Sequence, residues 1–212
     1  MALIKTRIEG ERLILSAPNQ HDIAIPLHAE GGDTLTVEIW DDHCEAKTVS
    51  EAVDSWLSQF LQSDCRLVYH PRDSVRQVDQ RYALPDDRTA FSDGFPFLIV
   101  SDASLQALNH AMQLEMSMQR FRPNLVVSGC EAYAEDSWRR IRIQDIAFRL
   151  PKPCSRCSVP TIDPETGDVG KEPLTTLNRL RKKDNKVYFG QNALHDGTGL
   201  LNVGDRVEIL EL

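Results

Sequence analysis

Residues 138–150, WRRIRIQDIAFRL, decide the fold class. Apolar side chains alternate with charged ones at Ile141 and Ile143, and again at Ile146, Phe148 and Leu150. A period of two residues is typical of strands with one buried face. The intervening pair, Gln144-Asp145, predicts a turn, so the stretch is expected to fold as two strands joined there.

More short strands are expected on both sides of this hairpin. Apolar runs before it predict buried strands at Phe95–Val100 and Asn124–Ser128. After it, strands are expected at Lys186–Phe189 and Arg206–Leu210, and a short helix at Pro173–Arg181. A helix capped by Ser101 or Asp102 is expected to reach about Met118. Many short strands and few helices predict an α+β, β-rich fold dominated by a β-barrel.

The first third of the chain has the same character. Strands are expected at 12–15, 23–27, 34–40, 44–49 and 67–69. Between them, 50–62 carries an apolar stripe at helical spacing, and Thr48 with Glu51 resembles a capping box. The polar segment 72–87 predicts a domain boundary. We expect residues 1–85 to form a partial N-terminal barrel-like subdomain and 86–212 the main domain.

Composition excludes several classes of function. The 212 residues carry a formal charge of −8, which argues against non-specific nucleic-acid binding. No apolar run approaches the roughly 20 residues that span a bilayer, and the first residues have no signal-peptide core. The cysteine count is five, an odd number, which predicts reduced thiols in the cytoplasm.

The motif Cys154-Ser155-Arg156-Cys157 places thiols beside a guanidinium. Arginine lowers the pKa of a nearby thiol and binds anions through its planar fork. Alone, the C-x-x-C pattern leaves structural roles and zinc open, although a zinc site usually needs a second close pair. A thioredoxin-like dithiol is disfavoured, because prolines and strands surround the motif. A thiolate beside an anion-binding group suits a soft metal on a phosphate-bearing cofactor.

Several spaced segments together resemble the MOSC domain family, which binds the molybdenum cofactor. They are FRPNLVVSG at 121–129, YAEDSW at 133–138, KPCSRC at 152–157, TIDPETG at 161–167 and EPLTTL at 172–177. The resemblance is strongest to the amidoxime-reducing branch and to bacterial reductases of N-hydroxylated bases. It runs from about Phe91 to the C-terminus, with a weaker likeness to the family's N-terminal barrel from Leu13 to about Tyr69.

The resemblance implies a molybdenum cofactor held by a defined set of side chains. Cys157 matches the cysteine that ligates the metal and is the implied catalytic residue. The residues that match contacts to the pterin and its phosphate are Ser92, Asp93, Gly94, Arg122, Asn124, Ser155 and Arg156. The family pattern also includes a Y-P-(I/V)-K-S segment and a following arginine before the point where this sequence starts, and this sequence contains neither. Asp136 and Trp138 are expected to be structural, and the roles of Cys130 and Cys154 stay open.

The implied activity is reduction of the N–O bond of small N-hydroxylated compounds. Electrons are expected from a separate flavin, haem or iron–sulfur protein, since the chain has no glycine-rich nucleotide loop. No nucleic acid and no membrane is expected as a partner. The alternative is a non-catalytic carrier of the cofactor or of sulfur. The basic cluster Arg179, Arg181, Lys182 and Lys183 is expected to be an exposed helix end, or a dock for an acidic electron donor.

Overall fold

The computed structural model describes all residues from 1 to 212. The chain divides into two compact units, each described by itself. Unit 1 consists of residues 1–76, 89–93 and 165–167, and unit 2 of 77–88, 94–164 and 168–212. The expected division at residue 85 remains a prediction, because the chain passes between the units more than once.

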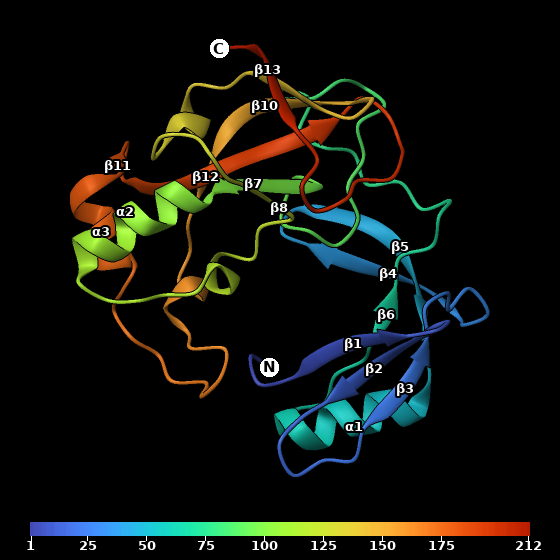
Figure 1. Cartoon of the computed structure of the whole chain (residues 1–212). Coiled ribbons are helices and arrows are strands. Elements are labelled where there is room, and N and C mark those ends of the chain that lie inside the picture. Colours follow the sequence, from blue (N-terminus) through green and yellow to red (C-terminus); the bar gives the residue numbers. More distant parts are fainter. The chain divides into compact units, whose positions relative to one another are not determined.

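Unit 1 is built from two small antiparallel sheets and one helix (Figure 1). The first sheet has the order β1-β2-β3, and the second the order β4-β5-β6. Their strands are Lys5–Glu9, Arg12–Ser16, Ile23–Pro26, Thr34–Ile39, Asp42–Thr48 and Val68–Tyr69. All were expected except β1, whose five residues are all exposed and so carry no alternation.

The helix of unit 1, α1 (Glu51–Leu61), forms where the apolar stripe predicted it. Val53, Trp56 and Leu57 are buried and pack with Leu15 and Ile25 of the first sheet. The expected capping residue was wrong. Ser50 is the N-cap and accepts a hydrogen bond from the N–H of Val53, whereas the Thr48 hydroxyl accepts one from the N–H of Asp33.

Unit 2 contains a seven-stranded sheet with the order β13-β9-β10-β12-β7-β8, on which β11 pairs with β12. All its pairs are antiparallel except β7 with β8. The hairpin of β9 and β10 turns at the predicted place, with Ile143 opposite Ile146. The strands are Phe97–Ser101, Leu125–Val127, Arg140–Ile143, Ile146–Ser155, Lys182–Lys183, Lys186–His195 and Val207–Glu211. The α+β, β-rich fold predicted from the sequence is confirmed.

Two helices accompany this sheet. Helix α2 (Asp102–Met112) is capped by Ser101 as expected but ends six residues before Met118. Gln113 takes a left-handed conformation, and the Asn109 side chain bonds to both the N–H and the C=O of Met116, which turns the chain. Helix α3 (Leu174–Leu180) is close to its predicted range. No helix is long and apolar enough to cross a membrane.

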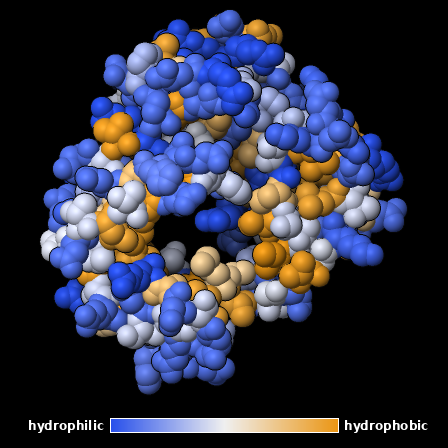
Figure 2. All heavy atoms as spheres, turned by 180° about the vertical axis from the view of Figure 1, so that it is seen from behind, coloured by the Kyte–Doolittle hydropathy of each residue, from blue (hydrophilic) through white to orange (hydrophobic).

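Apolar side chains fill one core in unit 1 and two in unit 2. One core of unit 2 contains Trp138 and the inward residues of β9 and β10, which include Ile141, Ile143, Phe148 and Leu150. The other contains Leu108 of α2, Phe121 and Phe189. The face drawn in Figure 2 is mostly hydrophilic, with separate hydrophobic patches.

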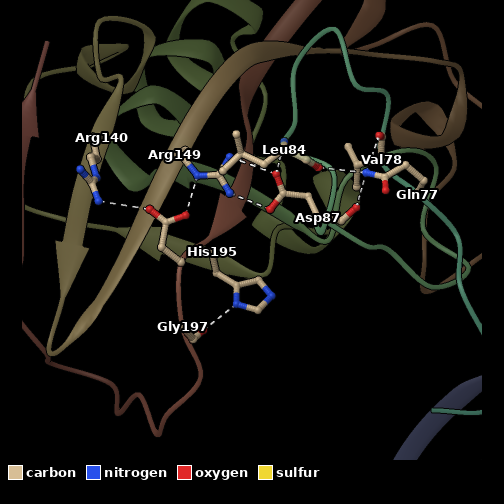
Figure 3. Close-up of polar contacts among 9 residues, drawn as sticks. Gln77, Val78, Leu84, Asp87, Arg140, Arg149, His195 and Gly197 are labelled. Carbon is tan, nitrogen blue, oxygen red and sulfur yellow. Dashed lines mark hydrogen bonds and ion pairs between the residues drawn. The ribbon is translucent and has the colours of Figure 1, made fainter. Parts of the chain in front are cut away.

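Part of the polar segment that was expected to mark the domain boundary belongs to unit 2. Asp87 accepts two hydrogen bonds from Arg149 of β10, at 2.7 and 3.0 Å, and Arg149 also pairs with Asp196 (Figure 3). Nearby, the ammonium of Lys152 lies 4.4 Å from the ring centroid of Tyr82. These contacts attach residues 77–88 to the strand that leads into the C-x-R-C motif.

Candidate cofactor site

Strand β10 ends at Ser155, within the C-x-R-C motif. Its pairing with β12 shifts register twice, between Arg149 and Lys152 and between Pro153 and Ser155. Pro151 and Pro153 have no N–H to donate to a ladder, so an irregular strand is expected here. After Ser155 pairs with Tyr188, the N–H of Arg156 bonds to the carbonyl of Val187 at 2.8 Å. Cys157 then leaves the sheet with its side chain exposed.

The Arg156 side chain is held in a fixed position. Nη2 donates to the Phe121 carbonyl at 2.9 Å. The guanidinium lies over the Phe121 ring, with its central carbon 5.5 Å from the ring centroid. Nη1 donates to the sulfur of Cys154 at 3.2 Å, so the guanidinium contacts the first cysteine of the motif. Nε is buried and has no partner. A buried donor without an acceptor is rare in folded proteins, and the Nε of Arg181 is a second such guanidinium donor in this structure.

The R-P-N segment lies beside this loop. Arg156 bonds to the carbonyl of the residue just before Arg122, and Arg120 pairs with Asp163 at 2.6 Å. Arg122 is exposed, with a left-handed φ of 54°. The Asn124 side-chain oxygen accepts a hydrogen bond from the backbone N–H of Leu98 at 2.8 Å. The backbone N–H of Asn124 donates in turn to the Leu98 carbonyl. The structure therefore brings Arg156 into contact with Phe121, the residue before the R-P-N segment, while the Asn124 side chain is bonded to Leu98.

Ser92 and Asp93 belong to unit 1, where a buried arginine holds their backbone. Arg76 is 4% exposed and donates to the carbonyls of Ala90, Ser92 and Asp93, and its Nε pairs with Asp42 at 2.9 Å. The side chains of Ser92 and Asp93 are exposed. Gly94 belongs to unit 2, and an added Cβ there would meet no atom within 4 Å. Sequence reasoning missed Arg76, because nothing in its polar surroundings indicates burial.

Cys130 lines a groove of about 810 Å³ in unit 2, between β8 and residues 201–209. Asn124 and Trp138 lie along the same groove. Burial raises the pKa of the Cys130 thiol, and the nearby carboxylates of Glu135 and Asp102 act in the same direction. Cys130 is therefore a mostly protonated thiol that faces a groove.

The donor set fits a metal carried by a phosphate-bearing cofactor. A thiol is the ligand type that soft metals take from proteins, and guanidinium groups bind phosphate. Cys157 is exposed, Arg156 has a buried N–H without an acceptor, and Arg122 is an exposed cation that forms no ion pair. No group of three or more His, Cys, Asp or Glu side chains is placed to hold a metal ion by itself.

Comparison with known proteins gives matches along both parts of the chain. Residues 1–64 match the MOSC N-terminal beta barrel domain, and residues 86–208 match the MOSC domain. Mitochondrial amidoxime-reducing component 1 of Homo sapiens is 37% identical over 224 residues, which cover 99% of this chain and 66% of the relative. The Danio rerio component 1 is 32% identical over 98% of this chain and 67% of the relative.

A second human relative, mitochondrial amidoxime reducing component 2, is 30% identical over 98% of this chain and 66% of its own length. The chain thus spans about 66% of the length of these curated relatives. The residues that carried the resemblance, from FRPNLVVSG to EPLTTL, all lie inside the matched MOSC range. This chain belongs to the MOSC domain family.

Proposed function

We propose that this protein binds the molybdenum cofactor and reduces the N–O bond of small N-hydroxylated compounds. The arrangement around Arg156 carries the proposal: its guanidinium, which has a buried, unpartnered Nε, contacts both Phe121, the residue before the R-P-N segment, and Cys154 of the motif that contains the exposed Cys157. Relatives named as amidoxime-reducing components support the substrate class.

We assign each site residue by what its side chain offers. Cys157 would ligate the molybdenum through its thiolate, the form of cysteine that binds metals. Arg156 and Arg122 would hold the phosphate end of the pterin, and Ser155 and the amide of Asn124 would add neutral hydrogen bonds. Two further contacts would come from the side chains of Ser92 and Asp93, whose backbone carbonyls Arg76 holds in place. Gly94 would contribute a backbone without a side chain.

When bound, the cofactor supplies the two-electron chemistry that reduces the N–O bond. Conversion of an amidoxime to an amidine consumes two electrons and two protons and releases water. The chain's own part is to bind and orient. Arg156 already has its orientation fixed by Phe121 and Cys154, so little side-chain entropy is lost when an anion binds.

Electrons are proposed to come from a separate flavin, haem or iron–sulfur protein, because the sequence contains no nucleotide-binding loop. For location we propose the cytoplasm, on the basis of the odd cysteine count. The proposal about the electron donor depends on activity being found first.

Molybdenum content tests the proposal. The protein, Cys157→Ser and the matched control Cys154→Ser are purified from a host that makes the cofactor and analysed for molybdenum and zinc. Near-stoichiometric molybdenum that is lost only in Cys157→Ser is the expected result. Equal molybdenum in all three proteins would remove Cys157 from the site, and zinc in place of molybdenum would overturn the cofactor assignment.

Catalysis is tested next, with benzamidoxime and a chemical electron donor. Turnover by the molybdenum-loaded protein, and none by Cys157→Ser, is expected. The alternative function, a carrier of cofactor or sulfur, is favoured by the exposure of Cys157. Retained molybdenum with no reduction of any N-hydroxylated compound would support the carrier.

A further inference from the structure

A cationic groove lies in unit 2 beside the C-x-R-C loop. Its volume is about 580 Å³. Five cations line it, namely Arg139, Lys152, Arg181, Lys182 and Lys183, against the two carboxylates Asp136 and Asp184. The formal charge of this lining is therefore +3, in a chain whose net charge is −8. We call this feature the cationic groove.

The lysines of the cationic groove are presented by a tight hairpin. Lys182 and Lys183 form β11 and pair with Val187 and Lys186 of β12. The two turn residues, Asp184 and Asn185, both have positive φ, 48° and 61°, which is the pattern of a type I′ turn. Such turns match the twist of the flanking strands, which favours a regular two-stranded hairpin at the lysines.

Most of these cations have no partner of opposite charge. Arg139, Lys152, Lys182 and Lys183 form no ion pair. The Asp136 carboxylate already forms an ion pair with Arg181. It also accepts a hydrogen bond from the side-chain amide of Gln191 at 2.8 Å. Arg181 is also held over the Tyr133 ring, 4.4 Å from its centroid. The groove thus has a fixed floor and several uncompensated positive charges at its rim.

The cationic groove adjoins the proposed cofactor loop. Tyr188 lines the groove and pairs with Ser155 across β10 and β12. Paired strand residues have Cα atoms about 5 Å apart, and two residues of chain extend about 7 Å, so the Cα atom of Cys157 lies within roughly 12 Å of that of Tyr188.

We propose that the cationic groove docks an acidic face of the partner protein that supplies electrons. This inference rests on the proposed function. An acidic partner would be repelled by a chain of charge −8, so a local patch of opposite sign is needed to orient it. The lysines of β11 are exposed, so they are accessible to a protein surface. The half-buried cation of the groove, Arg181, is already paired with Asp136 and lies over the Tyr133 ring, although its buried Nε has no acceptor.

Binding to an acidic redox protein tests this. The probe is a plant-type [2Fe–2S] ferredoxin, a strongly acidic carrier, titrated at 20 and 200 mM NaCl, with a basic cytochrome c as the negative probe. We expect ferredoxin binding in the micromolar range at low salt, weakened at least tenfold at high salt. The double variant Lys182→Glu/Lys183→Glu is expected to bind at least tenfold more weakly than the parent.

The matched control is Lys171→Glu/Arg206→Glu, two exposed cations that also form no ion pair. It makes the same change in net charge and is expected to alter the dissociation constant by less than threefold. Thermal unfolding curves verify that both variants fold. Equal weakening in both variants, or no ferredoxin binding at all, would overturn the proposal.

Competition separates a protein dock from a small-anion site. An octaglutamate peptide is expected to displace ferredoxin at concentrations where inorganic phosphate does not. Phosphate that competes as well as the peptide would assign the cationic groove to a small anion and overturn the docking inference. Because these measurements need neither molybdenum nor turnover, their failure is distinct from failure of the proposed function.

Discussion

The carboxylate of Asp87 is held in a bidentate pair by Arg149, 62 residues later in the chain (Figure 3). Asp87 also accepts from the N–H of Leu84 at 2.6 Å, and its carbonyl accepts from the N–H of Val78. One residue therefore shapes the loop of residues 77–88 internally and attaches it to β10. This strand continues into the C-x-R-C motif, so the loop supports the strand that positions the candidate site.

Acid is expected to weaken this attachment. Burial raises the pKa of Asp87, but the hydrogen bonds from Arg149 and Leu84 outweigh it and hold the pKa below the ordinary value. A lowered folded-state pKa contributes stability above the unfolded pKa, about 3.9, and that contribution disappears as the pH falls through the folded value. Asp87→Asn should thus lower the free energy of unfolding by about 1–2 kcal/mol at pH 7.

Urea unfolding at pH 7 and near pH 3 measures the difference in free energy of unfolding between the parent and Asp87→Asn. The difference between them should shrink at the lower pH, where the parent also loses its charge. Asp41→Asn, at an exposed carboxylate without a hydrogen-bond partner, is the control and should cost little at either pH. A difference that does not change with pH would contradict the ion-pair explanation.

Arg76 is expected to be essential for the backbone around Ser92 and Asp93. Lysine would keep the charge near Asp42 but cannot reach three carbonyls at once, since it lacks the planar fork. Arg76→Lys should destabilise the protein by about 2 kcal/mol and accelerate amide hydrogen exchange in residues 89–93. The control is Arg12→Lys at an exposed position. Unchanged exchange in residues 89–93 would show that the loop holds its shape without Arg76.

The cysteines are expected to differ in reactivity. Cys157 is exposed, Cys130 is half-buried with a raised thiol pKa, and Cys44 is 6% exposed. A short pulse of iodoacetamide at pH 7.5 should label Cys157 first, Cys130 slowly and Cys44 only on unfolding, because the thiolate is the reactive form. Peptide mass spectrometry gives the order. Raising the pH to 9 should markedly increase the rate at which Cys130 is labelled. If Cys130 is labelled as fast as Cys157 at pH 7.5, the effect of burial is contradicted.

The parts of the fold that were predicted correctly are those with local periodicity. The stripe in α1 and the alternation in β9 and β10 are properties of short stretches, and both elements formed where expected. Strand β1 has no buried residue, and the end of α2 depends on Asn109 contacting Met116 seven residues later. Neither feature leaves a periodic signal in its own segment.

The same limit applies to the candidate site. Family motifs give the positions of Arg122, Asn124 and the C-x-R-C loop, but contacts between segments decide how they are held. Arg156 bonds to Phe121, 35 residues away, and Arg76 bonds to backbone carbonyls 14 to 17 residues away. An arginine in a polar segment looks like a surface residue until the fold supplies its acceptors, so Arg76 could not be found from sequence.

Glu135 provides a test of a buried carboxylate in the YAEDSW segment. It is 1% exposed and accepts hydrogen bonds from the Ser101 N–H at 3.0 Å and from the Ser104 hydroxyl at 2.7 Å. The Ser104 oxygen also accepts from the N–H of Tyr133, and it lies 2.7 Å from the Ser101 hydroxyl. If Ser104 donates its single proton to Glu135, then Ser101 must donate to Ser104, and both acceptor positions of the Ser104 oxygen are filled.

Glu135→Gln should therefore be more damaging than its similar shape implies. The single amide oxygen of the new glutamine could still accept from the N–H of Ser101. Its NH₂ group, however, would face the Ser104 oxygen, which has no lone pair left to accept a hydrogen bond. A buried donor without an acceptor costs about 1–3 kcal/mol, and the favourable position of a negative charge at the start of α2 is also lost. Urea unfolding measures the loss. The combination Glu135→Gln with Ser104→Ala should cost less than the sum of the two single changes, because it removes the hydroxyl that the amide faces; strict additivity would contradict the proposed direction of these hydrogen bonds.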